Sequence, residues 1–375
     1  MSRSGSFARN RGSTVVPLAL AVWLACDSGD SGGFATPEPE AEPVPQQAVP
    51  LALDREALYQ HAQAVFDPLP EIAASDANPV TDEKVALGRT LYYEPRLSRN
   101  QDVSCNTCHP LDRFGADAKK TSSGHREQVG ARNSPTVYNA ALHLSQFWDG
   151  RAADVEEQAK GPVMNPVEMA MPSEDYVLEV LRSIPGYEPM FAAAFPGEEP
   201  VITFDNMARA IGAFERLLLT PSPFDAFLEG DLAALSEEQL EGLQVFLDTG
   251  CSVCHQGVGI GGGMYQKLGL VRPYPTEDPG RAEVTGNDAE RGFFKVPSLR
   301  NVAETGPYLH DGSVASLDQM IRIMASVQLG KDLGDEQVAA VRAFLESLTG
   351  RVEPTLIAKP ELPESGPDTP GADPS

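Results

Sequence analysis

Two copies of one short pattern carry the chemistry of this chain. In each copy two cysteines are separated by two residues, and a histidine directly follows the second cysteine. The copies are Cys105-Asn106-Thr107-Cys108-His109 and Cys251-Ser252-Val253-Cys254-His255. C-x-x-C-H is the attachment site of c-type haem, in which the thiols form thioethers and the histidine ligates the iron. Two such sites in a chain with five cysteines predict two covalently bound haem c groups.

The fifth cysteine lies in an N-terminal segment that indicates export. Residues 1–25 contain three arginines and then an apolar run, which has the length of a signal peptide and is short for a membrane span. Leu24-Ala25-Cys26 resembles a lipoprotein cleavage box, which would make Cys26 a lipidated first residue. An ordinary secretory signal is the alternative. Both interpretations predict a periplasmic protein, and Cys26 would be its only attachment to a membrane.

Charge and composition describe the layout of the chain. It has 375 residues and a formal charge of -25, which argues against a nucleic-acid partner because an acidic protein repels phosphate. Residues 26–50 are rich in Gly, Pro and Glu and predict a disordered tether. Residues 351–375 are Pro-rich and predict a disordered tail. Between them we expect two haem c domains, one over residues 51–218 and the other over residues 219–350.

The periodic segments between these termini are helical. Ser236 and Gln239 form a capping box, and the three leucines that follow share one face up to Gly250. Residues 207–218 carry a similar apolar stripe, and Asp335 can cap a last helix. No stretch alternates well enough to predict a buried sheet. We therefore expect a mainly α fold, with two cytochrome-c-like haem domains and long irregular loops around the cofactors.

An internal repeat relates the two haem units. A shift of 162 residues places Pro135, Asn139, Asp149 and Gly150 on Pro297, Asn301, Asp311 and Gly312. The haem histidines are only 146 residues apart, so the first unit is shorter between its haem motif and this segment. Two related domains, each of which needs a haem to complete a small core, account for the pattern.

The two units differ where a second axial ligand could stand. Met324 lies on an apolar helical face of the second unit, and a thioether is a good sixth ligand for an electron-transfer haem. Met320, one turn earlier, is the alternative, and core packing is the other use of such a methionine. The 162-residue shift places Pro162 opposite Met324, and proline cannot ligate iron. The first haem therefore lacks the matching ligand, with Met164 as a nearby alternative.

Polar residues after the first haem motif are candidates for its open side. His125 stands in a polar loop, where a histidine could bind iron in one state and leave it in another. Glu168 could take a proton from bound peroxide and return it to the leaving oxygen. Gln158 and Trp148 are further candidates. Taken singly, the histidine and the glutamate could equally be surface groups, and the tryptophan a packing residue.

These motifs together resemble the bacterial dihaem cytochrome c peroxidases over nearly all of residues 72–350. The matching segments are CNTCH, GHREQVGARNSPTVYNA, FWDGRAADVEEQ, NPVEM, CSVCH, KVPSLRNVAETGPYLHDGS and the segment around Met324. The resemblance implies that the first haem is the peroxidatic centre and that the second haem receives electrons. It also implies that His109 is the proximal ligand of the first iron, with His125 as its displaceable distal ligand. His255 and Met324 match the axial pair of the second iron.

Further roles follow from the same resemblance. Glu168 matches the acid/base carboxylate, Gln158 the polar residue beside it, and Trp148 an aromatic residue between the haems. His310 matches a histidine between the domains. The family's calcium site is matched by the side chain of Asn133 and the backbone carbonyls of Thr305 and Pro307, which are oxygen ligands that suit Ca²⁺. His61 and His143 receive no role from the sequence.

The reaction that the resemblance implies is the reduction of hydrogen peroxide to water. The electrons would come from a small periplasmic protein, a cytochrome c or a cupredoxin, that docks transiently on the acidic surface. We expect His125 to block the first iron in the oxidised enzyme and to leave when the second haem is reduced. The family is often dimeric, although no segment identifies an interface.

Two other functions stay open at this point. A dihaem oxidase that acts on a protein side chain is expected to have tyrosine on its second haem, which Met324 argues against. A plain dihaem electron carrier needs two closed irons, which Pro162 and Glu168 argue against.

Overall fold

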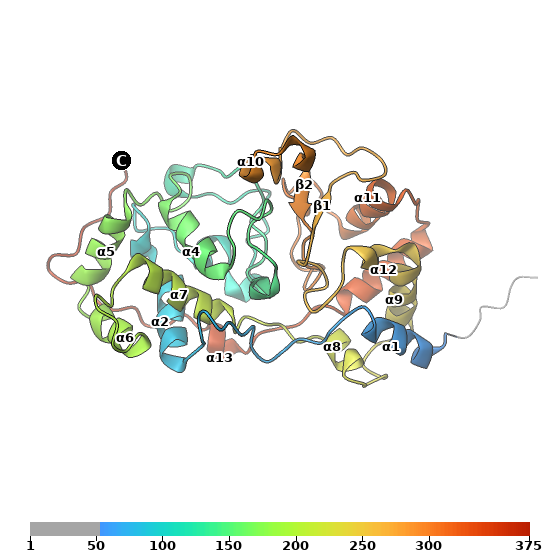
Figure 1. The fold of residues 1–375 in the computed structure, drawn as a ribbon, viewed down its shortest axis with the longest axis horizontal. Coiled ribbons are helices and arrows are strands. Elements are labelled where there is room, and N and C mark those ends of the chain that lie inside the picture. Colours follow the sequence, from blue (N-terminus) through green and yellow to red (C-terminus); the bar gives the residue numbers. More distant parts are fainter. Residues whose placement is uncertain (1–52) are drawn as a thin grey trace, which may run out of the picture. The chain divides into compact units, whose positions relative to one another are not determined.

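The computed structural model describes residues 53–375, and helices make up most of its regular structure (Figure 1). The predicted signal peptide (1–25), the tether (26–50) and the lipidation site Cys26 lie outside the described residues. Within residues 53–375 the only strands are two of three residues each, so the mainly α class is confirmed. In the same range, no helix is both long and apolar enough to cross a bilayer.

The elements fall into two helical halves, which we define as residues 82–218 (first half) and 219–350 (second half). Before and within the first half lie α1 (Arg55–Gln63), α2 (Asp82–Tyr92), α3 (Cys105–Cys108), α4 (Val155–Met164), α5 (Glu174–Ser183), α6 (Tyr187–Ala194) and α7 (Phe204–Glu215). Within and after the second half lie α8 (Pro223–Leu228), α9 (Glu237–Thr249), β1 (Tyr265–Lys267), α10 (Ala282–Thr285), β2 (Phe293–Lys295), α11 (Leu317–Leu329), α12 (Asp335–Glu346) and α13 (Pro354–Ile357). Strands β1 and β2 pair antiparallel, with Tyr265 opposite Lys295.

One helix crossing forms the centre of each half. Helix α2 packs against α7 in the first half, and α9 packs against α12 in the second. A glycine allows each close approach: a Cβ on Gly88 would lie 1.9 Å from the carbonyl oxygen of Ala210, and one on Gly242 would lie 1.9 Å from that of Ala340. In each half the helix with the glycine leads toward a haem motif, so this crossing sets where the motif begins.

The residues predicted from the sequence to cap or end the helices are largely confirmed. Ser236 caps α9 through the capping box with Gln239, and Gly250 ends the helix with φ 94° in the left-handed region. The expected cap at Asp335 is wrong by one position. Gly334 precedes α12, its backbone N–H donates to the side chain of Gln337, and Asp335 is the first helical residue.

The internal repeat is present in the backbone. Asn139 and Asn301 both adopt left-handed conformations, with φ 62° and 59°. Both side-chain amides donate to Oγ1 of Thr220, over 2.8 and 2.9 Å, so this hydroxyl joins equivalent residues of the two halves. The bridges Gln146–Ala152 and Tyr308–Val314 are also separated by the same 162-residue shift.

The N-terminal helix belongs to the second half, although the sequence-based boundary placed it in the domain of residues 51–218. Leu58, Ala62 and Phe66 are buried in the core of the second half. The ring of Phe66 lies edge-on to that of Phe224, with centroids 5.3 Å apart. An apolar helical face does not specify its partner, so the sequence could not decide which half α1 would cover.

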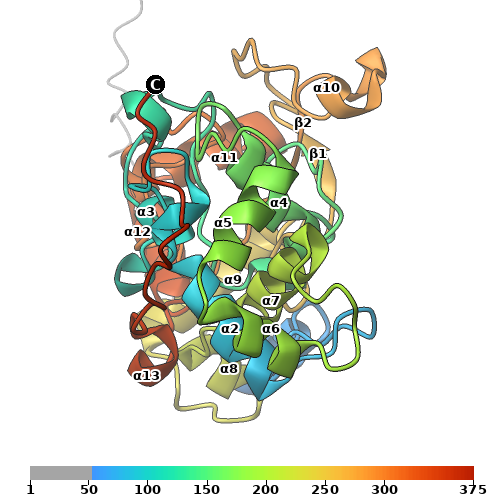
Figure 2. The same cartoon turned by 90° about the vertical axis from the view of Figure 1, so that its left-hand side faces the viewer.

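The C-terminal segment is ordered along the first half, whereas the sequence predicted disorder for residues 351–375. The hydroxyl of Tyr93 donates to the carbonyl of Ile357, and the guanidinium of Arg96 donates to that of Pro363 over 2.8 Å. Near the end, Arg99 pairs with Asp373 at 2.7 Å. Figure 2 shows this segment running beside the first half from α13 to the C-terminus. The Pro-rich composition hid it because its hydrogen bonds go to distant side chains rather than to its own backbone.

Candidate active site

The first C-x-x-C-H motif forms the short helix α3 and the turn after it. The backbone N–H of Ser104 donates to Oγ1 of Thr107 over 2.9 Å, and that of His109 donates to the carbonyl of Cys105 over 2.9 Å. Nδ1 of His109 lies 3.3 Å from the carbonyl oxygen of Gly115, which orients the ring and leaves Nε2 for a ligand. Burial lowers the pKa of His109, so the imidazole is neutral at neutral pH.

The second motif has the same arrangement. The backbone N–H of His255 donates to the carbonyl of Cys251 over 3.1 Å. The ring lies against Gly261, where an added Cβ would be 3.1 Å from Nδ1. Burial lowers the pKa of His255 to about 4. Gly261, with φ 118°, and Gly115, with φ 68°, occupy matching positions 146 residues apart in the two units.

The residues present at both motifs fit covalently attached haem c. All four motif cysteines are free thiols, and each pair is directly followed by a partly buried histidine whose pKa is lowered by burial. A disulfide-forming or redox C-x-x-C would not require a neutral histidine at that position. The thiols of Cys105 and Cys108 with His109 would hold the first haem, and those of Cys251 and Cys254 with His255 would hold the second.

The structure brings His125 and Glu168 together. The backbone N–H of His125 donates to the carbonyl of Glu168 over 2.7 Å. The neighbouring Gly124 makes this approach possible, because a Cβ there would lie 2.3 Å from the carbonyl oxygen of Val167. The sequence placed these two residues in separate segments, 43 positions apart (168 − 125), and only the fold makes them neighbours.

His125 is buried rather than solvated. It is 5% exposed, its Nδ1 has no hydrogen-bond partner, and its Nε2 lies 3.3 Å from the backbone oxygen of Ser375. Arg126 and Glu127, directly after it, have φ of 57° and 58°. Two consecutive left-handed residues with side chains are strained, which is a feature of segments that change conformation.

Glu168 is a partly buried carboxyl beside the first motif. Nδ2 of Asn165 donates to its Oε1 over 2.7 Å. Burial raises the pKa of Glu168, and the charge of Arg151 and the bond from Asn165 oppose this effect. Burial raises the pKa of Cys108 to about 11, with the charge of Glu168 among the smaller contributions in the same direction. The carboxyl therefore acts electrostatically on the first haem-attachment site.

Helix α4 supports this region. Gln158 lies half-buried on α4, one turn before Pro162. The backbone N–H of Met169 donates to the carbonyl of Pro162 over 3.1 Å, so the segment with Glu168 folds back along the end of α4. Met164, the alternative ligand, packs instead against the core of the first half.

Helices α4 and α11 are counterparts in the two halves. They begin at Val155 and Leu317, which the 162-residue shift superimposes. The shift therefore places Pro162 and Met324 at the same position of equivalent helices. Met324 is partly buried on α11, as is Met320. The predicted difference between the two halves, Met324 against Pro162, thus lies on equivalent helices.

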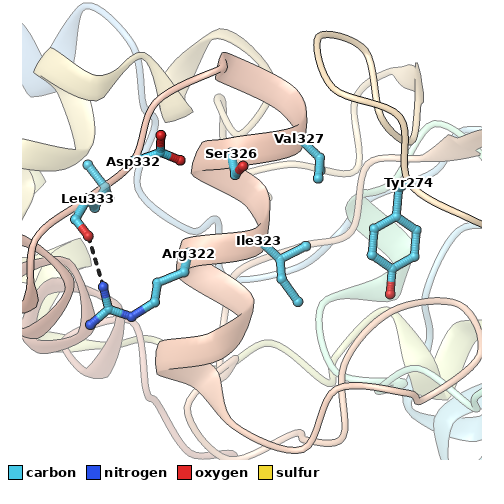
Figure 3. A pocket seen from close by; sticks show the side chains of 7 residues that line it. All are labelled: Tyr274, Arg322, Ile323, Ser326, Val327, Asp332 and Leu333. Carbon is cyan, nitrogen blue, oxygen red and sulfur yellow. Dashed lines mark hydrogen bonds between the residues drawn. The ribbon is translucent and has the colours of Figure 1, made fainter.

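A pocket lies on another face of α11. It has a volume of about 500 Å³ and is lined by Tyr274, Arg322, Ile323, Ser326, Val327, Asp332 and Leu333. Figure 3 shows Ile323 and Val327 on the side of the helix nearest Tyr274, while Arg322 donates to the carbonyl of Leu333 over 2.8 Å. Met324 is not among the lining residues, so this pocket does not identify its function.

Trp148 makes contacts with both halves. Its Nε1 donates to the carbonyl of Asn133 over 2.9 Å, and its own carbonyl accepts from the backbone N–H of Lys295 over 2.8 Å. Its ring lies edge-on to that of His310, with centroids 6.4 Å apart. Trp148 is thereby held at the junction of the two halves.

Asn133 is held at the same junction. Its backbone N–H donates to the carbonyl of His310 over 2.7 Å, and its Nδ2 donates to the carbonyls of Lys119 and Lys120. These bonds use the amide N–H groups and orient the side chain. Within residues 53–375, no cluster of three His, Cys, Asp or Glu side chains is arranged to hold a metal ion. A cation here would depend on amide and carbonyl oxygens, as predicted for Asn133, Thr305 and Pro307.

The sequence analysis did not identify Arg151 as a residue of this site. Its guanidinium stacks on the ring of Phe147, 3.4 Å from the centroid, and it also pairs with Asp149. It is the charged group that most opposes the rise in the pKa of Glu168. Its place in the segment FWDGRAADVEEQ was the available signal, but only the fold shows that its charge acts on Glu168.

The comparisons agree with this geometry. The family model described as di-haem cytochrome c peroxidase matches residues 82–233, and the cytochrome c model matches residues 239–349. A cytochrome c551 peroxidase of Pseudomonas aeruginosa is 46% identical over 330 residues, covering 86% of this chain and 94% of that protein. The chain belongs to the di-haem cytochrome c peroxidase family.

Further members of the di-haem cytochrome c peroxidase family and their structural relatives support this assignment. A cytochrome c551 peroxidase of Nitrosomonas europaea is 43% identical, covering 86% of this chain and 96% of that protein. The crystal structure of a MauG-like protein associated with microbial copper homeostasis has a TM-score of 0.68 and 29% identity, covering 78% of this chain and 95% of that one. The two family models meet near α9, where the second helical half has its central crossing.

Proposed function

We propose that this protein reduces hydrogen peroxide to water with electrons from a small periplasmic donor, a cytochrome c or a cupredoxin. The observation that carries the proposal is the difference between two equivalent helices. Helix α11 offers Met324 as a sixth ligand for the second haem, whereas α4 has Pro162 at the same position. Only the first haem would then have an open side, and the backbone contact between His125 and Glu168 supports assigning both residues to that side. The relatives that are 43–46% identical are named as peroxidases, which agrees with this assignment.

Each haem, when bound, supplies an iron that exchanges electrons, and the first also supplies the position at which peroxide binds. The net reaction consumes two electrons and two protons for each H₂O₂ and yields two waters. The protein must therefore move a proton between the two peroxide oxygens and deliver electrons one at a time.

Glu168 is the group that moves the proton. Its carboxylate would take the proton from one peroxide oxygen and give it to the other, which leaves as water. Partial burial raises the pKa of this carboxyl, which brings it closer to the value that suits a group acting first as base and then as acid. Asn165 orients the carboxyl through the 2.7 Å bond to Oε1. We assign Gln158 as a second polar group of the peroxide site.

His125 controls access to the first iron. We assign His125 as the residue that would ligate this iron in the oxidised enzyme, and its loop would change conformation once the second haem had accepted an electron. The left-handed conformations of Arg126 and Glu127 support such a change, because relief of their strain favours another conformation. In addition, no described residue forms a hydrogen bond with Nδ1 of His125, so this atom does not hold the imidazole ring in place.

Trp148 connects the two haem sites. When bound, the second haem would be held by His255 and Met324 and would receive the electrons of the donor, and the indole would lie on the route to the first haem. Nε1 of Trp148 donates to the carbonyl of Asn133, and the backbone carbonyl of Trp148 accepts from the N–H of Lys295, so this residue is bonded to both halves. We assign Ca²⁺ to the adjacent junction, with Oδ1 of Asn133 and the carbonyls of Thr305 and Pro307 as ligands. The cation would stabilise the same junction.

We also propose that the protein is exported by the signal peptide of residues 1–25, works in the periplasm and is anchored through a lipid on Cys26. Covalent haem c attachment suits such a compartment. We further propose a homodimer, in keeping with what is common in the family. The charge of -25 favours a donor with a basic contact surface, and this association should weaken with salt because ions screen it.

The deciding experiment measures peroxide consumption by the purified dihaem protein with reduced cytochrome c as the donor. Two molecules of cytochrome c should be oxidised for each peroxide, and the rate should depend on prior reduction of the second haem. A protein that exchanges electrons with cytochrome c but leaves peroxide intact would be a carrier. Oxidation of a protein side chain in preference to cytochrome c would favour the side-chain oxidase. Either result would overturn the proposal.

A further inference from the structure

A lysine amine is buried at the junction of the two halves and has no part in the proposed reaction. Lys295 is 7% exposed, and its Nζ lies 3.1 Å from Nδ1 of His143 and 2.9 Å from the carbonyl oxygen of Ser145. Nε2 of His143 is buried without a hydrogen-bond partner. Lys295 belongs to β2 of the second half, and His143 and Ser145 belong to the first half. We call Lys295 and His143 the junction pair.

The junction pair lies directly behind the backbone that borders the second haem ligand. The ring of His143 packs on Gly262, where an added Cβ would lie 2.3 Å from Cδ2. The next residue toward the haem motif, Gly261, borders the ring of His255. The carbonyl of Val296, adjacent to Lys295, accepts from the N–H of Gly262 over 2.8 Å. One layer of backbone therefore separates the junction pair from the ring of His255.

The groups that face Lys295 leave it without a counterion. Asp149, the acid whose charge acts on Lys295, is already paired with Arg132 and Arg151. The hydroxyl of Tyr265, on the paired strand β1, bonds to Oγ of Ser145 over 2.6 Å. Arg281, stacked on the ring of Tyr265, is itself paired with Glu290. Among the described residues, no carboxylate lies within ion-pairing distance of Nζ of Lys295.

This environment favours the neutral amine. Burial lowers the pKa of Lys295 to about 7, against an opposing effect of Asp149. Burial, and then the charge of Lys295, lowers the pKa of His143 well below its usual value, so the imidazole is neutral and its Nδ1 accepts the hydrogen bond. A lysine amine near its titration point is sensitive to any new charge nearby, because little solvent screens that charge.

We propose that the junction pair is a proton-binding site coupled to the second haem, so that Lys295 takes up one proton from solvent when one electron enters there. The added electron is a negative charge behind a single layer of backbone, and it favours the ammonium form of Lys295. The step forms one N–H bond on Nζ, and the electron comes from the donor protein. This inference depends on the proposed assignment of the second haem to His255.

The test is a redox titration of the holoprotein without peroxide, followed by the optical spectrum of the second haem from pH 6 to pH 9. In the wild type, the potential of the second haem should decrease with rising pH over part of this range. The slope should approach about 59 mV for each pH unit, the value for one proton taken up per electron. In Lys295→Met, which keeps the length of the side chain without a titratable group, the potential should be independent of pH over that part. Lys267→Met is the control: it removes an exposed lysine from the neighbouring strand β1 and should keep the wild-type slope.

His143→Leu supplies a second variant that keeps the amine and has no side-chain acceptor. Loss of the imidazole acceptor disfavours the ammonium form, so the bend in the profile of the oxidised protein should move to lower pH by at least half a unit. Equal slopes in the wild type and in Lys295→Met, or an unmoved bend in His143→Leu, would overturn the proposal. Failure of the peroxidase assignment gives a different result: the potential would follow pH as expected, but the enzyme would consume no peroxide.

Discussion

Substitution of Glu168 by glutamine removes the proposed proton carrier with little change in shape. Glutamine retains a carbonyl oxygen that can accept the bond from Nδ2 of Asn165, now 2.7 Å from Oε1. It cannot accept a proton from peroxide at any accessible pH. The backbone bond from His125 to the carbonyl of residue 168 is independent of the side chain. We therefore expect both haems to be retained with unchanged optical spectra.

The size of the effect follows from the role assigned to the carboxyl. General acid–base catalysis contributes about 10²- to 10⁴-fold to a rate, which is about 3–5 kcal/mol of transition-state stabilisation. We expect kcat/KM for peroxide in Glu168→Gln to fall by this factor. The wild-type kcat/KM should also fall as the pH drops through the raised pKa of Glu168, because the base must be ionised in the free enzyme. This acid limb should be absent from the variant.

The assay is steady-state oxidation of reduced cytochrome c by peroxide, after the second haem has been reduced. Glu157→Gln is the matched control, because Glu157 lies on α4 and its side chain is 54% exposed and pairs with Lys160. It should retain activity within about twofold, since an exposed pair of this kind is worth little. If Glu168→Gln also stayed within about twofold while retaining both haems, Glu168 would have no acid/base role.

Three further results are expected. Glu156→Gln should lower the free energy of unfolding of the holoprotein by about 3–5 kcal/mol in a denaturant titration. The reason is that Glu156 holds the buried guanidinium of Arg216 through two hydrogen bonds of 2.9 and 2.8 Å. A loss below about 1 kcal/mol would contradict this. His125→Ala should make the all-ferric protein high-spin at the first haem and reactive to peroxide without prior reduction, and a low-spin spectrum identical to the wild type would count against His125 as the blocking ligand. A chain that ends after Val352 should have a lower midpoint of thermal unfolding, because Tyr93 loses its contacts with the C-terminal segment. The optical spectrum of the second haem should not change. An unchanged midpoint would show that the packed C-terminal segment adds no stability.

The amino-acid sequence alone determined the features that depend on local pattern. The two C-x-x-C-H motifs, the capping box of Ser236 and Gln239, and the shift of 162 residues between the units can all be read without a fold. The motifs and the capping box can be read because thioether attachment and helix capping involve residues a few positions apart, and the repeat can be read because its two segments match without a gap. The same shift also predicted that Pro162 and Met324 are counterparts, and the common starting points of α4 and α11 confirm it.

Tertiary structure decided which distant segments meet. It placed α1 on the second half and residues 353–375 on the first, and it set the backbone of His125 against that of Glu168. It also turned His143, to which the sequence gave no role, into the partner of a buried lysine. Apolar faces and buried polar groups do not specify their partners in sequence. Their pairing depends on which surfaces the whole chain can bury together, and so only the packed molecule reveals it.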